Sequence, residues 1–505
     1  MFDKVLVANR GEIAVRVMRT LKEMGIETVG VYSQPDRQSL HVRYADEAYC
    51  VGPAPSSESY LDIERILEVA HESGAEAIHP GYGFLSENPE FSQACRDAGV
   101  KFIGPYAKSI EAMGEKTGAR TLMREADVPV VPGNQNPVSS VEEGREIAES
   151  MEFPVLVKAA AGGGGKGMRR VDEPAQFEAA FEGARREAIN SFGNGDLYVE
   201  KYVVNPKHVE IQILLDEHGN GVHLFERECS VQRRHQKIIE ETPCPVLEEE
   251  TRREMGEVAL RAAEAVDYVG AGTVEFLLDA DQNFYFLEMN TRLQVEHPIT
   301  EALTGLDLVR WQVEVAADRE LPFEQEDLDR RGAAIECRIY AEDPDQDFMP
   351  TPGDIAFVRE PSDPGVRVDS GVYTGSTIPK HYDPLVSKLV TWGGDREHAI
   401  RRMRRCLDEY VVSGLTTNLD FHEEVLEHPD FLDGTYDTEF VPDYMEQRDA
   451  DTEAELDGEV AEIAAVLAAH RRAEQLKREA SSDGQSSGGD GERWKRYGRF
   501  RQLGR

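Results

Sequence analysis

Glu275 and Glu288 have a spacing that could place two carboxylates around a divalent cation. They lie in the segment 273–290, TVEFLLDADQNFYFLEMN, where two alternating runs flank a turn-rich stretch, and this pattern predicts a β-hairpin. With residues 280–283 as the loop, Glu275 faces Glu288, and opposed side chains share one face of a sheet about 5 Å apart. Two like charges so placed favour a cation between them, and oxygen ligands without His or Cys suit Mg²⁺ or Mn²⁺. The alternative is a solvated sheet face that carries two surface glutamates.

A glycine-rich loop lies earlier in the chain, within residues 153–168, FPVLVKAAAGGGGKGM. An apolar strand delivers Lys158 to the start of the loop, and backbone N–H groups in such loops can hold phosphate oxygens. No Ser or Thr follows Lys166, so the segment is not a P-loop, and its match to GxGxxG is weak. The residues that follow, MRRV, predict a return strand, which favours a strand–loop–strand clamp. A plain flexible linker is the alternative.

Charged residues also gather between these two segments. Residues 198–237 contain YVEKYVVNPKHVEIQ and ECSVQRRHQK, in which Glu200, Lys201 and His208 alternate with apolar residues, as in strands that line a cleft. Positive charge is concentrated at Arg233, Arg234, His235 and Lys237. On a chain of net charge −40, this cluster favours an anionic ligand over a solvated face.

Three further charges, Arg292, Glu296 and Arg338, are embedded in largely apolar, strand-like surroundings. They occur in NTRLQVEHP (290–298) and ECRIYAED (336–343). Buried charges must be paired or functional, because their transfer out of water is costly. These residues are therefore candidates for a site.

These segments together identify a family. From Met1 to about Tyr444, the chain resembles the biotin carboxylases of the ATP-grasp superfamily. The matching segments follow the family's order and are spread along the chain: ANRGEIAVR, HPGYGFLSEN, GGGGKGM, EKYV–NPKHVEIQ, RECSVQRRHQK, EFLL, FLEMNTRLQVEHP and ECRIYAEDP. Agreement over so many ordered segments is much more specific than any single motif.

The resemblance implies an ATP site and a metal site. ATP would be bound by Lys116, Lys158, Gly164, Gly165, Glu200, Lys201, Tyr202, Val203, His208, Gln232, His235, Glu275 and Glu288. The metal ions would be held by Glu275 and Glu288, with Asn290 near them.

The resemblance also implies a bicarbonate site and a biotin site. Bicarbonate would be held by Lys237, Arg292, Gln294 and the Val295 amide. Glu296 would be the base that deprotonates bicarbonate. Arg338 would stabilise the enolate of biotin, with Tyr82 as a further biotin contact. The catalytic set would be Lys237, Arg292, Glu296 and Arg338.

The reaction that the family implies begins when bicarbonate attacks the γ-phosphate of ATP to give carboxyphosphate and ADP. Carboxyphosphate then yields CO₂ and phosphate, and biotin is carboxylated at N1. Positioned cations and Mg²⁺ or Mn²⁺ would neutralise the charge on the moving phosphoryl group. A mobile glycine lid would exclude the water that destroys the intermediate.

Partners are implied by the resemblance and by a missing motif. The sequence has no AMKM-like biotinylation motif, so biotin is expected on a separate biotin carboxyl carrier protein. A carboxyltransferase subunit would pass the carboxyl group to acetyl-CoA or propionyl-CoA, with pyruvate as the second choice. Arg16, Arg19 and Glu23 match the family's dimer surface and imply a homodimer.

Two other functions fit part of the pattern. Another ATP-grasp carboxylate ligase, such as half of a carbamoyl-phosphate synthetase, would share the ATP site, but the ECRIYAED segment argues against it. A non-catalytic nucleotide-binding regulatory subunit would not need the full set of Lys158, Glu275, Glu288, Arg292, Glu296 and Arg338.

The elements that must position these residues begin with a βαβ pattern over the first 110 residues. It predicts a parallel sheet with helices on both faces, which binds ligands at the carboxyl ends of its strands. Strands are expected at 5–8, 27–32, 75–78 and 101–103, and helices at 12–24, 60–72 and 91–98.

The whole chain is predicted to combine α/β and α+β folds. Residues 1–114 form a Rossmann-like parallel-sheet domain, and residues 115–330 form an ATP-grasp domain with a mobile glycine-rich lid at about 131–203. Residues 331–445 form a strand-rich C-terminal domain. Residues 446–505 contain a charged helix, a flexible linker and a basic aromatic end, RWKRYGRFRQLGR, which could dock a partner subunit.

Composition excludes several other classes of protein. The 505 residues are 40% hydrophobic, enough to fill several cores, and the N-terminal apolar run VLVA is too short for a signal peptide or membrane span. A cytoplasmic protein with reduced cysteines is expected, since the six cysteines have no zinc spacing. Net charge −40, with 14 lysines against 42 arginines, disfavours a nucleic-acid surface. It favours a high-salt cytoplasm over an ordinary acidic enzyme.

Overall fold

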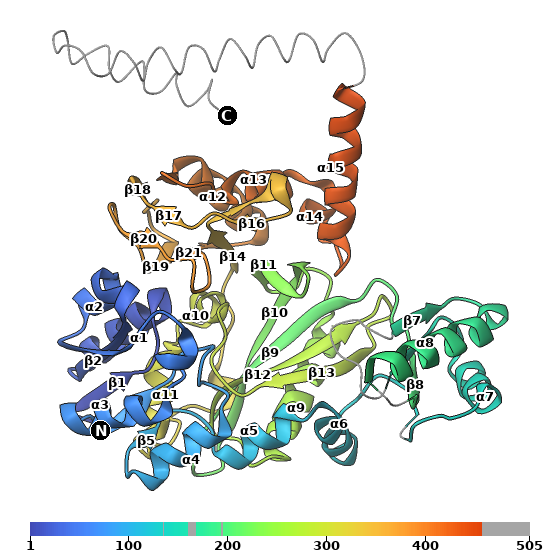
Figure 1. Ribbon diagram of the computed structural model, residues 1–505, viewed down its shortest axis with the longest axis horizontal. Coiled ribbons are helices and arrows are strands. Elements are labelled where there is room, and N and C mark those ends of the chain that lie inside the picture. Colours follow the sequence, from blue (N-terminus) through green and yellow to red (C-terminus); the bar gives the residue numbers. More distant parts are fainter. Residues whose placement is uncertain (135, 160–167, 193–194, 457–505) are drawn as a thin grey trace. The chain divides into compact units, whose positions relative to one another are not determined.

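The structure is a computed structural model that describes residues 1–134, 136–159, 168–192 and 195–456 (Figure 1). The side chains of 116–117, 191–192 and 449–456 are outside this description. Residues Met1–Val441 form one compact unit, and a second unit begins at Pro442.

Five parallel strands form a sheet from the first 110 residues, in the order β3-β2-β1-β4-β5. The strands are β1 (Lys4–Val7), β2 (Glu27–Ser33), β3 (Glu47–Gly52), β4 (Ala77–His79) and β5 (Lys101–Phe102), and the main helices are α1 (Gly11–Glu23), α2 (Leu40–Tyr44), α3 (Ile63–Ser73) and α4 (Pro89–Asp97). Val5, Leu6 and Val7 are fully buried because both faces of the sheet are covered. The predicted strands and helices are confirmed. The sequence missed β3, an edge strand that is mostly half-exposed and therefore has no continuous apolar run.

Eight antiparallel strands form the largest sheet, in the order β13-β12-β9-β10-β11-β14-β21-β19. They are β9 (Lys207–Leu215), β10 (Gly221–Arg233), β11 (Gln236–Thr242), β12 (Gly270–Leu278), β13 (Phe284–Asn290), β14 (Ala333–Tyr340), β19 (Val366–Ser370) and β21 (Leu385–Gly393). Every residue of β9 is buried, so polar residues on this strand need partners inside the protein. The sheet continues across residue 331, because β14, β19 and β21 extend it.

Three helices pack on this sheet. Helix α9 (Glu249–Glu264) contacts β9 and β10, α10 (His297–Thr304) contacts β11, β14 and β21, and α11 (Leu308–Ala316) contacts β12. Helices α5 (Ala107–Gly114) and α6 (Lys116–Glu125) lie before it in the chain. The start of α10 therefore reaches the strands that carry the predicted catalytic residues.

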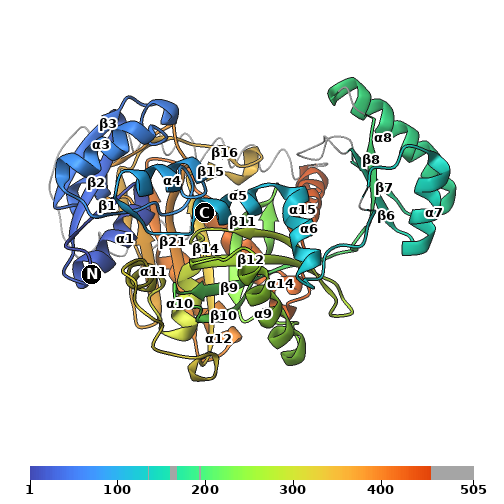
Figure 2. The same ribbon diagram turned by 90° about the horizontal axis from the view of Figure 1, so that it is seen from below.

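A separate three-stranded sheet, in the order β7-β6-β8, contains the strands on either side of the glycine run. Its strands are β6 (Val155–Ala159), β7 (Met168–Val171) and β8 (Leu197–Lys201), and α7 (Val141–Met151) and α8 (Phe177–Phe192) pack against it (Figure 2). The antiparallel pairing of β6 with β7 confirms the predicted return strand. The glycine run at 160–167 lies outside the described residues.

The β12–β13 hairpin has the predicted opposition of Glu275 and Glu288, although its loop differs. Leu278, not Asp279, pairs with Phe284, because the Asp279 carboxylate accepts backbone N–H groups of the loop and closes a tighter turn. A bulge between Glu275 and Phe276 then restores the expected register. The loop prediction was wrong by one residue, and the bulge compensates for it.

The last described part of the chain is helical. It contains α12 (Arg396–Glu409), α13 (Leu419–Glu427), α14 (Pro429–Asp433) and α15 (Phe440–Leu456), with short paired strands β15 (Glu342–Asp343), β16 (Met349–Pro350), β17 (Gly353–Asp354), β18 (Phe357–Arg359), β20 (Thr377–Ile378) and β22 (Val411–Ser413). The strand predicted at 354–359 is in fact β17 and β18, which pair with different partners. None of the described helices has the length and apolar character needed to cross a bilayer. All six cysteines are free thiols, as expected.

Candidate active site

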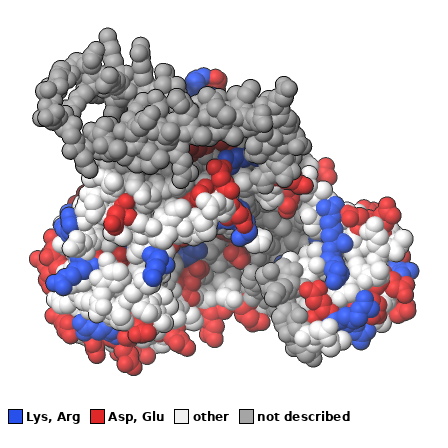
Figure 3. All heavy atoms as spheres, turned by 45° about the horizontal axis from the view of Figure 1, so that its top comes forward, with Lys and Arg blue, Asp and Glu red and all other residues white. Residues whose placement is uncertain are grey.

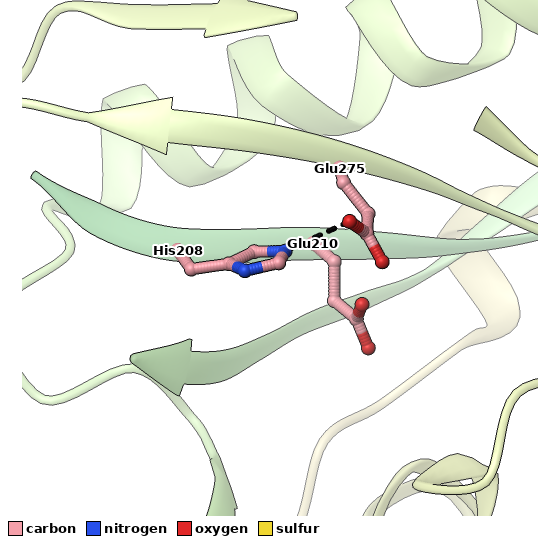
Figure 4. A group of neighbouring side chains, drawn as sticks. All are labelled: His208, Glu210 and Glu275. Atoms are coloured by element: carbon pink, nitrogen blue, oxygen red, sulfur yellow. Dashed lines mark ion pairs between the residues drawn. The ribbon is translucent and has the colours of Figure 1, made fainter. Parts of the chain in front are cut away.

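The centre of the site lies where β9 meets β12. The register between these strands puts Glu275 opposite Glu210, and His208 is on the same face of β9 two residues away. All three side chains are buried, and they point toward one another (Figure 4). His208 Nε2 lies 3.0 Å from Glu275 Oε2. Two carboxylates that face each other in a buried sheet require a cation between them.

Lys237 on β11 supplies that cation. Its Nζ lies 2.5 Å from Glu210 Oε2, 2.8 Å from Glu275 Oε1 and 2.7 Å from Glu296 Oε1. Burial alone would lower the pKa of Lys237, but the three carboxylates raise it well above the usual value. Lys237 is therefore a fixed positive charge at the meeting point of three acids.

Glu275 and His208 affect each other in the same way. Burial acts to raise the pKa of Glu275, but Lys237 and His208 hold it well below its usual range. Burial acts to lower the pKa of His208, yet Glu275 raises it above the ordinary value. The centre of the site is therefore charged, with acids and bases in contact.

Glu296 lies between two cations. The segment 291–296 is an irregular turn before α10, so the strand-like surroundings expected for Arg292 and Glu296 were wrong, whereas Arg338 is on β14. Arg338 Nη2 donates to Glu296 Oε2 at 3.0 Å, and Lys237 binds the other oxygen. Burial opposes the ionisation of Glu296, but these two cations hold its pKa far below the usual range. Glu296 is an ionised carboxylate within reach of both predicted substrate-binding cations.

Arg338 has a second carboxylate partner, Glu240 on β11. Arg338 Nε donates to Glu240 Oε1 at 2.6 Å. Burial raises the pKa of Glu240 to about 7, against the effect of Arg338. Arg338 is thus held from one side by Glu240 and from the other by Glu296.

The remaining residues predicted for bicarbonate lie beside this network. Gln294 Nε2 donates to Glu275 at 2.8 Å, and its Oε1 accepts from Lys237 at 3.3 Å. Arg292 Nε donates to Glu87 Oε2 at 2.6 Å, and Arg292 Nη2 donates to Asn290 at 2.9 Å. The structure therefore brings together the predicted set of Lys237, Arg292, Gln294, Val295 and Glu296.

Tyr82, predicted to contact biotin, is half-buried in the loop after β4, and its hydroxyl donates to the buried carboxylate of Glu12.

Two residues predicted for ATP, Lys158 and Glu200, form an ion pair across β6 and β8 in the small sheet. Arg120 Nη1 of α6 also binds Glu200, at 2.6 Å. Lys201 at the end of β8 instead donates to the carbonyls of Met151 and Glu152 at the end of α7. The prediction treated 200–203 as one adenine-binding stretch, but the side chains of Glu200 and Lys201 have different partners.

The other predicted ATP residues are spread over several elements. Gln232 is buried on β10 directly opposite Lys237, and His235 is exposed in the β10–β11 turn. Tyr202 and Val203 follow β8, and Arg170 stacks on the Tyr202 ring at 4.5 Å. Lys116 begins α6, but its side chain is outside the description, as are Gly164 and Gly165.

A divalent cation would fit at the edge formed by β12 and β13. Glu288 is half-buried opposite Glu275, and Asn290 Nδ2 donates to Glu275 Oε1 at 2.9 Å. His208, Glu210 and Glu275 also offer ligand atoms that all lie within 4.8 Å of one another. Oxygen-rich donors of this kind suit Mg²⁺ or Mn²⁺. The residues present thus fit the predicted metal, with Glu275 common to both groups.

Sequence reasoning missed four charges that pair with the predicted residues or with one another: Glu87, Glu210, Arg227 and Glu240. Arg227 is fully buried and donates to Glu210 Oε1 at 2.5 Å, to Gln212 and to Thr300. Glu210 could have been found from its place two residues after His208 on an expected strand, and Glu87 from its place in the HPGYGFLSEN segment. No local signal marks Arg227 or Glu240, whose partners are remote in the sequence.

Family models match three consecutive parts of the chain. Residues 1–110 match the biotin carboxylase N-terminal domain, and residues 336–443 match the biotin carboxylase C-terminal domain. Residues 115–324 match the ATP binding domain of the carbamoyl-phosphate synthase L chain. The two flanking domains separate this chain from the synthetase alternative.

Relatives agree along the whole matched length. The chain is 53% identical to a pyruvate carboxylase subunit of Methanothermobacter thermautotrophicus, over 89% of this chain and 92% of the relative. It is 51% identical to biotin carboxylase of Nostoc, over 87% and 98%. It is also 53% identical to the alpha subunit of mouse mitochondrial methylcrotonoyl-CoA carboxylase, but it spans only 62% of that longer relative's length.

Solved structures share the fold. The bicarbonate-bound biotin carboxylase domain of a thermophilic 2-oxoglutarate carboxylase superimposes with a TM-score of 0.84 at 45% identity, covering 88% of this chain and 98% of that one. A biotin carboxylase–β,γ-ATP complex from Campylobacter jejuni gives 0.80 at 46% identity, covering 88% and 99%. On these grounds, the chain belongs to the biotin carboxylase family of ATP-dependent ligases.

Proposed function

We propose that this chain carboxylates biotin with bicarbonate and ATP by means of the buried charge network on the eight-stranded sheet. The observation that carries the proposal is Glu296, an ionised carboxylate held between Lys237 at 2.7 Å and Arg338 at 3.0 Å. A base that faces one cation for the carbonate and another for an enolate is what the two steps of this reaction need.

Bicarbonate would bind among Lys237, Arg292, Gln294 and the Val295 amide. In the structure, Lys237 divides its charge among three carboxylates, and this holds the pKa of Glu296 low. An anion that binds Lys237 would draw part of that charge away from Glu296. The pKa of Glu296 would then rise toward the range in which a carboxylate accepts a proton effectively.

ATP would bind between the small sheet and the β12–β13 edge. Lys158 and His208 would contact phosphate oxygens, and Glu275, Glu288 and Asn290 would hold Mg²⁺ or Mn²⁺. The metal, when bound, would neutralise charge on the phosphoryl group as bicarbonate attacks it. Glu200 is already paired with Lys158 and Arg120, so it would orient Lys158.

Biotin would reach Arg338 and Tyr82 on a separate biotin carboxyl carrier protein. The pyruvate carboxylase subunit of Methanothermobacter thermautotrophicus is aligned over 92% of its length, which supports a subunit rather than a whole carboxylase. We propose a cytoplasmic homodimer that works with a carboxyltransferase subunit for acetyl-CoA or propionyl-CoA. Pyruvate is the second candidate acceptor, and this relative favours it.

Steady-state ATP hydrolysis by the purified chain tests the proposal. Hydrolysis should require bicarbonate, rise when free biotin is added, and yield carboxylated biotin that can be trapped with ¹⁴C-bicarbonate. ATP hydrolysis that ignores both bicarbonate and biotin would refute it. Identification of the subunits that co-purify with the chain would decide among the carboxyl acceptors.

A further inference from the structure

Lys388 on β21 is a fully buried lysine that the proposed reaction does not use. The strand register places it directly opposite Arg338 on β14 and, on its other side, opposite Asp369 on β19. Opposed side chains share a face, so Arg338 and Lys388 are two neighbouring cations on the side of the sheet that carries the site. Like charges in this arrangement repel unless each has its own partners.

The turn before α10 provides those partners. Arg338 Nη2 donates to the Glu296 carboxylate at 3.0 Å, and Lys388 Nζ donates to the backbone carbonyl of Val295 at 2.9 Å. Two adjacent cations on the sheet therefore hold two adjacent residues of one irregular turn. Because the Val295 carbonyl belongs to the peptide that ends at the Glu296 nitrogen, this hydrogen bond sets the orientation of both residues.

Lys388 also connects this turn to the loop that carries Tyr82. Its Nζ lies 3.3 Å from Glu12 Oε1 and 3.8 Å from Asp369 Oδ2, and the Tyr82 hydroxyl donates to the same Glu12 oxygen. Glu12 begins α1, and the backbone there is approached so closely by Gly371 that a Cβ on Gly371 would lie 2.7 Å from the Glu12 nitrogen. Glu12, Val295 and Lys388 come from the three matched family domains in turn.

We propose that Lys388 is a positioning residue for bicarbonate. Its ammonium holds the Val295 carbonyl, and this keeps the Val295 amide and the Glu296 carboxylate aimed at the same anion. Through Glu12, it couples that turn to Tyr82 at the biotin side of the site. Lys388 itself touches no substrate. The inference rests on the proposed function, because it names what positions that site.

Lys388→Met tests this role, because methionine keeps much of the side-chain length and removes the ammonium. Loss of a charged hydrogen bond of this kind should raise the KM for bicarbonate about tenfold or more. The KM for ATP should stay within about twofold, since the Lys158–Glu200 pair is on another sheet. Lys380→Met, at an exposed lysine eight residues earlier, is the matched control and should behave as the wild type.

Lys388→Met leaves Glu12 and Asp369 buried without this cation, and it could fail to fold. The double variant Glu12→Gln/Lys388→Met removes one of these charges and should show the same rise in the bicarbonate KM. Thermal unfolding of every variant identifies which ones are folded.

The proposal is overturned if a folded variant without Lys388 keeps the wild-type KM for bicarbonate. It is also overturned if the KM values for ATP and bicarbonate rise together, because that pattern indicates a general structural loss. If the wild-type chain itself hydrolyses ATP without any need for bicarbonate, the proposed function fails, and this result is distinct from the first two.

Discussion

The charges proposed for the two substrates lie on two sheets, and they differ in exposure. At the buried end, on the eight-stranded sheet, the side chains of Glu210, Lys237 and Glu296 are 0%, 10% and 2% exposed. At the small-sheet end, those of Lys158 and Glu200 are 23% and 12% exposed. Buried charges must be fully paired before any ligand arrives, whereas partly exposed charges can exchange partners with water at low cost. The chemical end is therefore built in advance, and the nucleotide end can adapt.

Glu296→Gln should show the largest effect, because it removes the proposed base from the buried end. The kcat for biotin carboxylation should fall about 10²-fold or more, the range lost with a general base. ATP affinity should change little, because the small-sheet end is untouched. ¹⁴C-bicarbonate fixation and nucleotide titration measure the two quantities, and wild-type turnover in this variant would remove Glu296 from its role.

Glu240→Gln should reveal the pH dependence of the buried end. The pKa of Glu240 is about 7 in the folded protein against an ordinary value of 4.5. The folded protein then binds this proton more tightly than the unfolded chain does. The contribution of Glu240 is present below about pH 4.5 and is lost as the pH rises through about 7, at most roughly 3 kcal/mol.

Urea unfolding at about pH 5 and about pH 8 checks this sign. Wild-type stability relative to Glu240→Gln should fall between the two values, whereas Glu64→Gln, at an exposed position on α3, should give no such trend. A difference that stays flat with pH would mean that Arg338 keeps Glu240 ionised throughout.

Glu200→Gln should have a smaller effect, at the small-sheet end. A partly exposed pair contributes up to about 1 kcal/mol, so the KM for ATP should rise about fivefold or less. The KM for bicarbonate should not change. If it rose as much as the KM for ATP, the two ends would not be independent, and the comparison would fail.

Molar KCl should act on the surface more than on either end. On the face shown in Figure 3, acidic side chains are spread among basic ones, and the chain carries a net charge of −40. Salt screens exposed charges far more than buried ones, so the thermal unfolding midpoint should rise by a few degrees between about 0.1 and about 2 M KCl. A midpoint that stays constant or falls would contradict the high-salt interpretation of the composition.

Local sequence was enough wherever the partners of a residue are close in the chain. The βαβ order of the first 110 residues predicted the parallel sheet, and the turn in 273–290 predicted the opposition of Glu275 and Glu288. The family resemblance added the identities of Lys237, Glu296 and Arg338, which the fold then brought together. Even the error in the hairpin loop was local, a one-residue miscount that a bulge compensates for.

Only the tertiary structure decided how the buried charges are paired. Arg227, Glu240 and Lys388 have partners 15 to 98 residues away, so no periodicity or spacing could indicate which charge neutralises which. Their pairing depends on the register of strands that are adjacent in the sheet but distant in the chain. The sequence by itself determined the fold and the chemistry of the site. The structure determined that its base lies between two cations and that a third buried cation holds the turn that carries it, because a buried charge is stable only where the assembled fold supplies its partner.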